Sequence, residues 1–559
     1  MRKSNRYLIA LVAALGLIPV VLDTTIVVVA LARIQNELHT DVNTGQWIVT
    51  GFFLANAAVV AIGGYLGGRF GRKRIFILGI TVFTIGSFLC GISPSIGWLI
   101  AFRAVQGIGG GLMLPIGPAL AFDAFAKEER AKASAVVAVP VLLAPVFGPI
   151  AGGYLIDTFD WHSIFYVNLP IGALAVLAAL LVLPRDKPGA ARGARFDYLG
   201  LLLSTLGVVA IVYAFKLVTQ TDPSTVTATN PGGHLYGWGY WLVWTLLGAG
   251  AVVLGIFALY ALRISRDPAL DLRQLGRRDF LVSNTISWAT ALITFGLLVL
   301  LPLYFEFVRL PHLSALDTGL ALVPLGIGSL VGTVASAALY RAVGPRWVVL
   351  LGASLSALGA WLFAHTIQPT ADAGQILAAV QTHTKIPAVV GPDELRWELF
   401  IVGLSFTLIA VAAQTLALEA LTGEALAKAS SLFISTKFIF SSIGVAILTT
   451  ILVNRTSSRA SDLIGQLHAL GQGTGISPSD PRVVAALRAV EAQIGTQAGT
   501  WAIQSIFWLI FFGSFVLIAL AFVLPGRRRK MDAAVSAAEK GVDYGSGASG
   551  EPQTISATS

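Results

Sequence analysis

Cysteine is nearly absent from this sequence. Cys90 is the single cysteine among 559 residues, so neither an intramolecular disulfide nor a cysteine metal cluster can form. The seven histidines are scattered and show none of the spacings that bind zinc. The glycines at 107–111 lie inside an apolar run and lack the Lys-Ser or Lys-Thr of a phosphate loop. We therefore expect no metal, no cofactor and no ATP-driven transport by this chain alone.

Charged residues are also scarce, at 12% of the chain against about a quarter in soluble domains. Hydrophobic residues make up 55%, and the mean hydropathy is +0.78. A bilayer span needs about 20 apolar residues. Because the strands of membrane barrels are shorter and alternate, the sequence predicts an all-α membrane protein. The 14 predicted transmembrane helices lie near 8–31, 46–67, 75–93, 96–122, 133–156, 163–183, 197–217, 240–262, 280–306, 316–340, 347–365, 399–418, 429–453 and 501–524.

The formal net charge of +9 could suggest a nucleic-acid partner. With 14 spans, however, most of the Lys and Arg residues fall on the side of the N-terminus, as expected for the cytoplasmic side of a membrane protein. The sequence therefore predicts a multi-pass protein of the bacterial cell membrane, with both termini in the cytoplasm and no nucleic-acid partner. The first apolar run, from Tyr7 to Leu31, is too long for a signal peptide and is expected to span.

Three segments on the predicted external side are long, at 218–239, 366–398 and 454–500. In the third, Asp480 and Pro481 form a helix start signal. Apolar residues then recur at helical spacing, at Val483, Leu487, Val490 and Ile494. This pattern predicts an amphipathic external helix that leads into the last span, and a surface helix with no direct role is the simpler interpretation. The Gly/Ser/Ala-rich tail at 527–559 is expected to be disordered.

A short glycine- and arginine-rich motif, GYLGGRFGRKR, occupies residues 64–74, in the predicted cytoplasmic loop between the second and third spans. Glycine permits tight turns and close helix approach, and the cations can anchor the loop at lipid headgroups or pair with helix ends. The motif residues that we single out are Gly64, Gly68, Arg69, Gly71 and Arg72.

This segment resembles the loop signature G-x-L-A-D-R-x-G-R-K-x of the major facilitator superfamily. Further matches are LDTTIVVVAL at 22–31, RAVQGIGGG at 103–111, GPIAGG at 148–153 and WHSIFYVNLPIG at 161–172. Together they resemble the fourteen-helix drug:proton antiporters of that superfamily. In the family an acidic residue at the position of Gly68 helps to latch the two halves together, so the resemblance implies an altered latch here.

The motif at 148–153 contributes Gly148, Pro149, Gly152 and Gly153. The resemblance to these antiporters implies a bent helix that prevents leakage while the two halves move relative to each other. An ordinary membrane helix kinked by proline is the alternative interpretation.

A faint internal repeat supports a two-part architecture. LYRAVGPR at 339–346 is a degraded copy of the segment at 66–73, and 273 residues separate Gly71 from Gly344. This spacing predicts two six-helix bundles, at 1–184 and 279–526, with two helices inserted at 185–278. Two parallel halves with a binding site between them are a typical transporter layout.

Two opposite charges fall deep within predicted spans, Asp23 in the first and Arg103 in the fourth. A charge at mid-bilayer costs several kcal/mol, so both are expected to face the bundle interior. Gln106 lies one turn from Arg103 on the same face. We interpret Asp23 and Arg103 as a proton-coupling pair, in which Asp23 alternates between a charged, paired form and a protonated form. A static structural ion pair is the alternative.

Two further intramembrane charges leave alternatives open. Glu306, at the external end of the ninth span, is either a second proton-coupling or cation-binding carboxylate or a solvated residue at the headgroups. Lys437, in the thirteenth span, pairs with a carboxylate or an anionic substrate, or serves only as a packing cation. With Gln106 they are the candidates for a substrate cavity.

These observations predict a proton-coupled antiporter that exports amphipathic or cationic small molecules by alternating access. The proton gradient drives it, membrane lipids surround it, and it works as a monomer. An exporter of lipid or of an endogenous metabolite is the alternative on the same architecture. An intramembrane enzyme or a channel is a distant alternative, because no nucleophile–base pair or other catalytic constellation occurs.

Overall fold

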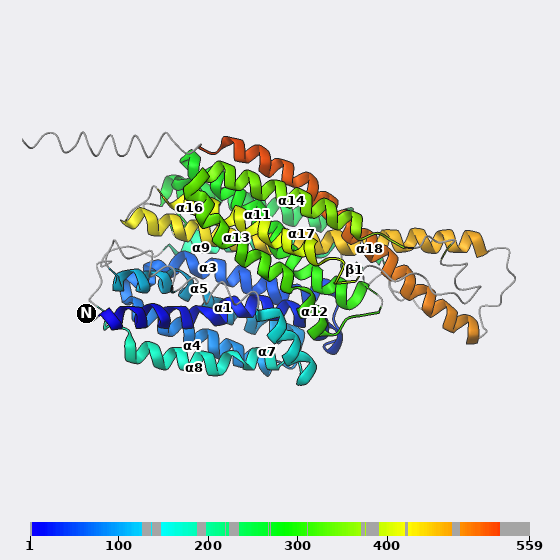
Figure 1. Cartoon of the computed structure of the whole chain (residues 1–559), viewed down its shortest axis with the longest axis horizontal. Helices are drawn as coiled ribbons and strands as arrows, with labels where there is room; N and C mark the ends of the chain where they lie inside the picture. The colour runs from blue at the N-terminus through cyan, green and yellow to red at the C-terminus, as the bar shows by residue number, and fades with distance from the viewer. Residues whose placement is uncertain are drawn as a thin grey trace, which may run out of the picture.

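The computed structural model describes the chain at residues 3–125, 136, 147–186, 197–218, 220–222, 234–265, 268, 270–309, 311–370, 375, 391–419, 423–471 and 481–525. Within these residues the protein is built from long apolar helices, which confirms the predicted all-α membrane fold (Figure 1). Twelve helices are long and apolar enough to cross a membrane, and a shorter apolar stretch lies at Trp47–Val60. The fifth predicted span, 133–156, falls largely outside the described residues, so the count of 14 stays a prediction.

The N-terminal half contains a helical segment at 147–158 besides its labelled helices. The labelled helices are α1 (Lys3–Glu37), α2 (Val42–Gly45), α3 (Trp47–Phe70), α4 (Arg72–Gly91), α5 (Ile96–Ala124), α7 (Ser163–Tyr166) and α8 (Asn168–Val182). Helix α5 packs against α1, α3 and α4, and α8 packs against α1 and α4.

The C-terminal half repeats this arrangement: α16 packs against α11, α13 and α14, and α18 packs against α14. Its elements are α11 (Arg278–Leu303), the π-helical turn η5 (Tyr304–Val308), α12 (Ala315–Ala321), α13 (Val323–Val343), α14 (Pro345–Thr366), α16 (Arg396–Glu419), α17 (Gly423–Gly471) and α18 (Pro481–Val523).

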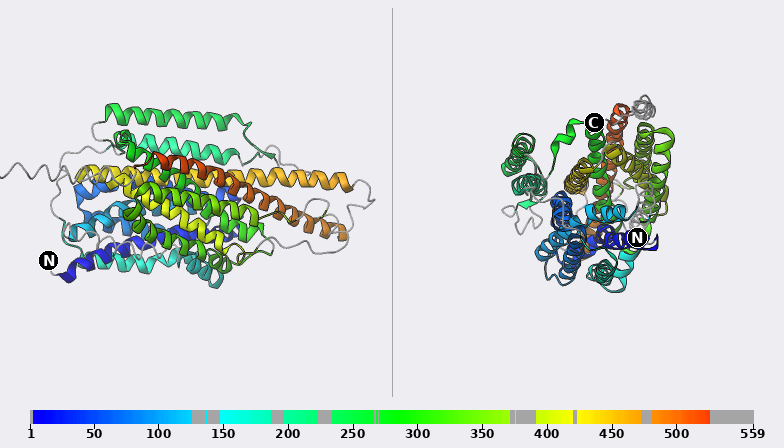
Figure 2. Two further views of the ribbon diagram at one scale, coloured as in Figure 1. Left: turned by 45° about the horizontal axis from the view of Figure 1, so that its top comes forward. Right: turned by 90° about the vertical axis from the view of Figure 1, so that its left-hand side faces the viewer.

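Between the halves, α9 (Tyr198–Val218) and α10 (Trp241–Leu259) form a pair that lies outside the main bundle (Figure 2). Two short strands join them, with β1 (Thr221–Asp222) antiparallel to β2 (His234–Leu235). The turns η3 (Tyr260–Ile264) and η4 (Leu272–Gly276) follow α10 and lead to α11. Helix α9 contacts α3 of one half and α17 of the other, so the inserted pair is attached where the two halves meet.

The internal repeat is visible in backbone geometry. Gly71 and Gly344 are each the single residue between two helices, and both have positive φ angles, of 103° and 89°. The N–H of each donates to the carbonyl four residues earlier, at 3.1 Å and 3.0 Å. Positive φ strains residues with a Cβ, which explains why the degraded copy of the motif has kept this glycine.

A basic side chain ties each repeat to the last helix of its own half. Lys73 Nζ donates to the carbonyls of Leu180 and Leu183 at the end of α8, at 2.8 Å and 2.7 Å. Arg346, which lies 273 residues later, donates from Nε and Nη2 to the Leu524 carbonyl after α18, at 2.8 Å and 2.6 Å. Carbonyls at a helix C-terminus carry partial negative charge, so cations are stabilised there.

The segment predicted as external at 454–500 differs most from the sequence expectation. The last helix begins at Pro481, as its start signal predicts, but the preceding span does not end near residue 453. Helix α17 runs for 49 residues, about 70 Å, against a hydrocarbon core of about 30 Å. It therefore projects beyond the bundle beside α18 (Figure 1). Neither proline nor glycine occurs between Asn454 and Ile464, so the helix continues where the apolar run stops.

The N-terminus of α1 and the C-terminus of α18 lie at the same end of the molecule (Figure 1). The long projection, α7 and α12 lie toward the opposite end. We call these the terminal face and the projection face. The charge distribution predicts that the terminal face is cytoplasmic and the projection face external.

Candidate functional site

A buried ion pair lies at the centre of the N-terminal half. Arg103 on α5 donates from Nη1 to Asp23 Oδ2 on α1, and each residue is 1% exposed. The same Nη1 donates to Gln106 Oε1 at 2.7 Å, and Nε donates to the Ile48 carbonyl at 3.0 Å. The guanidinium also lies 4.4 Å from the centre of the Phe52 ring. The sequence prediction that Asp23 and Arg103 face the interior is therefore realised in the structure.

Three neutral side chains complete the surroundings of Asp23. Gln106 Nε2 and Asn168 Nδ2 both donate to Asp23 Oδ1, at 2.9 Å and 3.4 Å. They also donate to Ser87 Oγ, at 3.2 Å and 3.0 Å, and Ser87 donates to the Phe165 carbonyl at 2.9 Å. The group formed by Asp23, Ser87, Arg103, Gln106 and Asn168, here called the polar cluster, thus joins α1, α4, α5 and α8.

The sequence does not single out Ser87 and Asn168. Ser87 lies in an otherwise ordinary apolar helix, and Asn168 lies within the WHSIFYVNLPIG segment. A buried polar residue in a membrane helix is itself a signal, because it needs a hydrogen-bond partner. Gln106 is predicted to line a substrate cavity, but the structure buries it completely inside the polar cluster.

The glycine motif at 148–153 forms a contact between the two halves. Gly153 packs against the backbone of α12, where an added Cβ would lie 2.5 Å from Leu316 Cα. Gly319 of α12 packs against Pro149 in return, and its Cβ would lie 2.2 Å from the Pro149 carbonyl oxygen. Asp157 Oδ2 accepts from the Leu316 N–H at 2.7 Å. The halves therefore meet backbone to backbone, and we call this contact the glycine seal.

The other two glycines of the motif pack within their own half. A Cβ on Gly148 would overlap Thr25 of α1, and one on Gly152 would lie 3.3 Å from Ile26 Cα. The segment is thus fitted between α1 on one side and α12 on the other. Because α12 lies toward the projection face (Figure 1), the glycine seal joins the two halves on that side.

Glu306 lies beside the glycine seal rather than next to the polar cluster. It belongs to the π-helical turn η5, a type of irregularity that is frequent at functional sites. Its polar neighbours are Thr318 of α12 and Asp157 of the segment at 147–158. Glu306 is partly buried, and Oε1 is buried without a hydrogen-bond partner among the described residues. This placement differs from a fully solvated residue at the headgroups.

Lys437 lies in α17, a helix that contributes to neither the polar cluster nor the glycine seal. It is partly accessible, and it forms no ion pair with a described acidic residue. The three candidates for a substrate cavity, Gln106, Glu306 and Lys437, therefore occupy three separate places in this conformation.

The predicted loop at 64–74 is almost entirely helical. Gly64, Gly68 and Arg69 belong to α3, which runs to Phe70, and Arg72 begins α4. Only Gly71 lies outside a helix, because its positive φ makes the turn by itself. The expectation of a loop at these residues is wrong.

A carboxylate is nevertheless present beside this turn. Asp186 follows α8 and accepts from the backbone N–H groups of Lys73 and Arg74, at 2.9 Å and 3.0 Å. It thereby caps the N-terminus of α4. A Cβ on Gly71 would lie 2.2 Å from Asp186 Cγ, so the glycine also makes room for this carboxylate. Asp186 joins elements of one half only and therefore does not substitute for a latch between halves.

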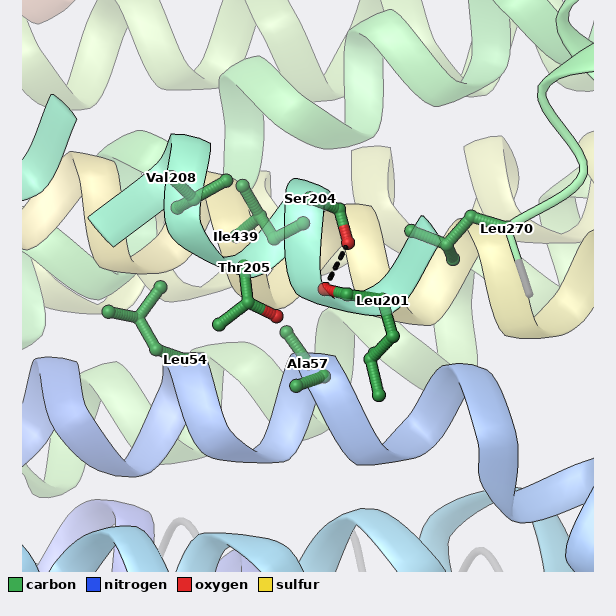
Figure 3. A pocket seen from close by; sticks show the side chains of 9 residues that line it. Leu54, Ala57, Leu201, Ser204, Thr205, Val208, Leu270 and Ile439 are labelled. Carbon is green, nitrogen blue, oxygen red and sulfur yellow. Dashed lines mark hydrogen bonds between the residues drawn. The ribbon is translucent and has the colours of Figure 1, made fainter. Parts of the chain in front are cut away.

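A small crevice lies where α9 meets α3 and α17 (Figure 3). Ser204 donates to the Leu201 carbonyl at 3.0 Å within it. No charged side chain lines this crevice, so it is separate from the polar cluster and from Lys437. The lining residues are Leu54, Ala57, Ala58, Leu201, Ser204, Thr205, Val208, Leu270 and Ile439.

Comparison with known proteins gives consistent matches. The family model of the Major Facilitator Superfamily matches residues 13–445. The multidrug resistance protein B homologue of Mycobacterium tuberculosis is 30% identical over 465 residues, covering 82% of this chain and 79% of that protein. The multidrug export protein EmrB of Escherichia coli K12 is 28% identical over 488 residues, covering 87% and 86%. The puromycin resistance protein of Streptomyces alboniger is 31% identical, covering 79% and 81%.

Two solved structures share the fold. An inward-facing, unoccupied bacterial homologue of the human lysosomal transporter Spinster has a TM-score of 0.56 at 15% identity, covering 94% of this chain and 98% of that one. A xylose transporter of Escherichia coli, in a partially occluded inward-open conformation, has a TM-score of 0.54 at 12% identity, covering 94% and 100%.

The buried ion pair predicts that removing one of its two charges destabilises the protein strongly, and that removing the second charge as well restores part of the lost stability. Arg103→Met leaves the Asp23 carboxylate buried without its cation, which should cost about 3–5 kcal/mol of unfolding free energy. The double variant Asp23→Leu with Arg103→Met removes both charges and should recover part of the loss. Unfolding of the purified protein would measure both. Arg33→Met is the matched control, because the Arg33–Glu37 pair is exposed. A double variant no more stable than Arg103→Met would contradict the interpretation.

The glycine seal predicts that a larger side chain separates the halves on the projection face. Gly153→Val should lengthen the distance between spin labels at Phe159→Cys and Leu320→Cys by several ångström, since both positions are exposed and Cys90 is fully buried. Electron–electron double resonance would measure this distance. Gly152→Ala is the matched control, because Gly152 packs within one half. An unchanged distance in Gly153→Val would exclude the seal.

Proposed function

The chain belongs to the major facilitator superfamily of transporters, and from that membership we propose that it is a proton-coupled antiporter for amphipathic or cationic small molecules. It is a multi-pass cell-membrane protein of the multidrug-efflux type, and the family indicates a transporter rather than an enzyme. The names of these relatives support small-molecule substrates. Coupling to protons and the transport cycle belong to the proposal.

The observation that carries proton coupling is the Asp23–Arg103 ion pair. A structural ion pair inside an apolar bundle is a poor source of stability, because desolvation of both charges offsets their attraction. Intramembrane ionisable groups are therefore usually functional. In the proposed cycle, protonation of Asp23 removes the charge that binds Arg103. Gln106 and Asn168 then lose a charged acceptor, and the contacts between α1, α4, α5 and α8 change together.

The glycine seal supports alternating access. The two halves are in direct backbone contact toward the projection face, and both solved structures described above are inward-facing or inward-open. We propose that this conformation has released its proton and is ready to take up substrate from the cytoplasm. Breaking the contact between Gly153 and α12 would then open the path to the exterior.

Glu306 is proposed as a second protonation site, because its carboxylate lies beside the contact that must open. The chain needs no cofactor in this scheme, and the proton gradient drives a single chain in the bilayer. Export of a lipid or an endogenous metabolite is a second candidate function. The projection of α17 and α18 beyond the bundle favours it, because these helices extend the chain past the membrane surface.

The decisive variant is Asp23→Asn, which keeps the size and most hydrogen bonds but cannot bind and release a proton. Proton-driven uptake of ethidium, a neutral drug or a fluorescent lipid into inverted vesicles should fall to the level set by an uncoupler. Exchange of labelled substrate without a gradient should continue. The three probes also distinguish drug export from lipid export.

Asp160→Asn serves as the matched control, since Asp160 is an exposed acid in the same half. It should transport like the unmodified protein. Gradient-driven uptake by Asp23→Asn at the unmodified rate would reject Asp23 as the coupling residue.

A further inference from the structure

Lys437 differs from the other cation within the membrane region, Arg103. Arg103 is paired with Asp23, whereas no described acidic residue pairs with Lys437. An unpaired charge at this depth is costly, so the ammonium group needs either water or an anion. Lys437 keeps a partly accessible surface in this conformation.

The position of Lys437 follows from the packing of α11 against α17. A Cβ on Gly444 of α17 would lie 2.1 Å from the Leu292 carbonyl oxygen of α11, so the two backbones touch. One turn earlier, the rings of Trp288 and Phe440 stack with centroids 4.7 Å apart. A further turn earlier, Thr436 donates to Asn284 at 3.4 Å. The three contacts share one register, so the two helices run parallel.

Lys437 directly follows Thr436 and is therefore within one helical turn of Asn284 and Trp288 along the shared axis. Asn284 Nδ2 and Trp288 Nε1 are buried and have no hydrogen-bond acceptor among the described residues. The Asn284 oxygen already accepts from Thr436. The Asn284 amide, the Trp288 indole and the Lys437 ammonium group can therefore all donate hydrogen bonds to a ligand, and the ammonium group also carries a positive charge. Ser283 and Ser435 add two unpartnered hydroxyls, which can donate as well.

This donor group lies where the two halves meet. Phe438, the residue after Lys437, has its ring 5.7 Å from Phe53 of α3 in the other half. Phe53 also makes an edge contact with Phe295 of α11, at 4.8 Å. Aromatic side chains therefore flank the donors. A ligand that satisfies both features has an oxyanion at one end and an apolar or aromatic body at the other.

We propose that Lys437, Asn284 and Trp288 form an anion-binding subsite for acidic amphiphiles that carry a carboxylate, sulfonate or phosphate group. The substrate range then includes acids in addition to neutral and cationic compounds. The movement of such a ligand across the membrane rests on the proposed export function, whereas its binding does not. Two sources share the required chemistry, a small aromatic acid and an anionic lipid headgroup.

The test compares an acid with its neutral isostere. Tritiated 1-naphthaleneacetic acid and 1-naphthaleneacetamide are titrated at pH 7 onto the full chain in phosphatidylcholine nanodiscs. Hydrogen bonds to charged groups are stronger than neutral ones. The acid should therefore bind at least about tenfold more tightly than the amide. Lys437→Met should abolish this difference by weakening acid binding alone, and Lys437→Arg should retain most of it.

Lys216→Met, at the outer end of α9, is the matched control and should bind both compounds normally. Unchanged amide binding shows that Lys437→Met is folded. Equal loss of acid and amide in Lys437→Met would overturn the proposal and make Lys437 a packing residue. Equal affinity of the unmodified protein for acid and amide would also overturn it.

Two further arms separate the remaining outcomes. In the first arm, the chain is placed in nanodiscs that contain phosphatidylglycerol. If this lipid competes with the acid in a way that depends on Lys437, the subsite also binds lipid phosphate; if it does not compete, the subsite is restricted to soluble acids. Both results support an oxyanion site. Lysine-dependent binding without proton-driven uptake would support the subsite and reject the export function. Proton-driven uptake of the amide, with no lysine-dependent acid binding, would support the export function and reject the subsite.

Discussion

The structure depends on how a charge is kept inside an apolar bundle. Asp23 and Arg103 can remain in the N-terminal half because each supplies the other's counter-charge, and because Gln106 and Asn168 donate further hydrogen bonds to the Asp23 carboxylate. Four helices contribute to the polar cluster. Any event that changes the charge of this group therefore acts on all four helices together.

The two halves are built alike but carry different chemistry. Each has a one-residue glycine turn and a basic side chain that holds the end of its last helix, at Lys73 and Arg346. In the N-terminal half Arg103 is neutralised by Asp23, whereas in the C-terminal half Lys437 pairs with no described acidic residue and Glu306 lies beside the glycine seal. In the proposed mechanism, the N-terminal half therefore holds the proton-coupling pair, and the C-terminal half carries the second protonation site and the surface that meets the substrate.

Much of this arrangement could be predicted from the sequence. Apolar runs locate most described helices to within a few residues. The cost of burying a charge predicts that Asp23 and Arg103 face the interior and pair. The repeat at Gly71 and Gly344 predicts the two-part plan. Contacts between distant residues that leave no local pattern could not be predicted. Ser87 joins the polar cluster only through the packing of α4, and Asp186 reaches the Gly71 turn from the end of another helix.

Local composition also misled where helices do not end at the membrane boundary. Helix α3 continues through its glycines to Phe70, and α17 continues through polar residues to Gly471. Hydropathy reports the solvent around a segment, whereas helix length depends on the absence of residues that interrupt backbone hydrogen bonds. The two criteria agree inside the bilayer and separate outside it.

The close packing of Gly153 against α12, and of Gly319 against Pro149, has a consequence for the energy balance of the cell. A carrier that uses a proton gradient must not conduct ions or form a continuous chain of water when it is not transporting, because each leaked proton dissipates the gradient. Where two backbones touch, no side chain is left whose thermal rotation could open a gap for solvent. In the proposed proton-coupled cycle, the barrier to leakage at this contact therefore rests on the absence of a Cβ at Gly153 and Gly319.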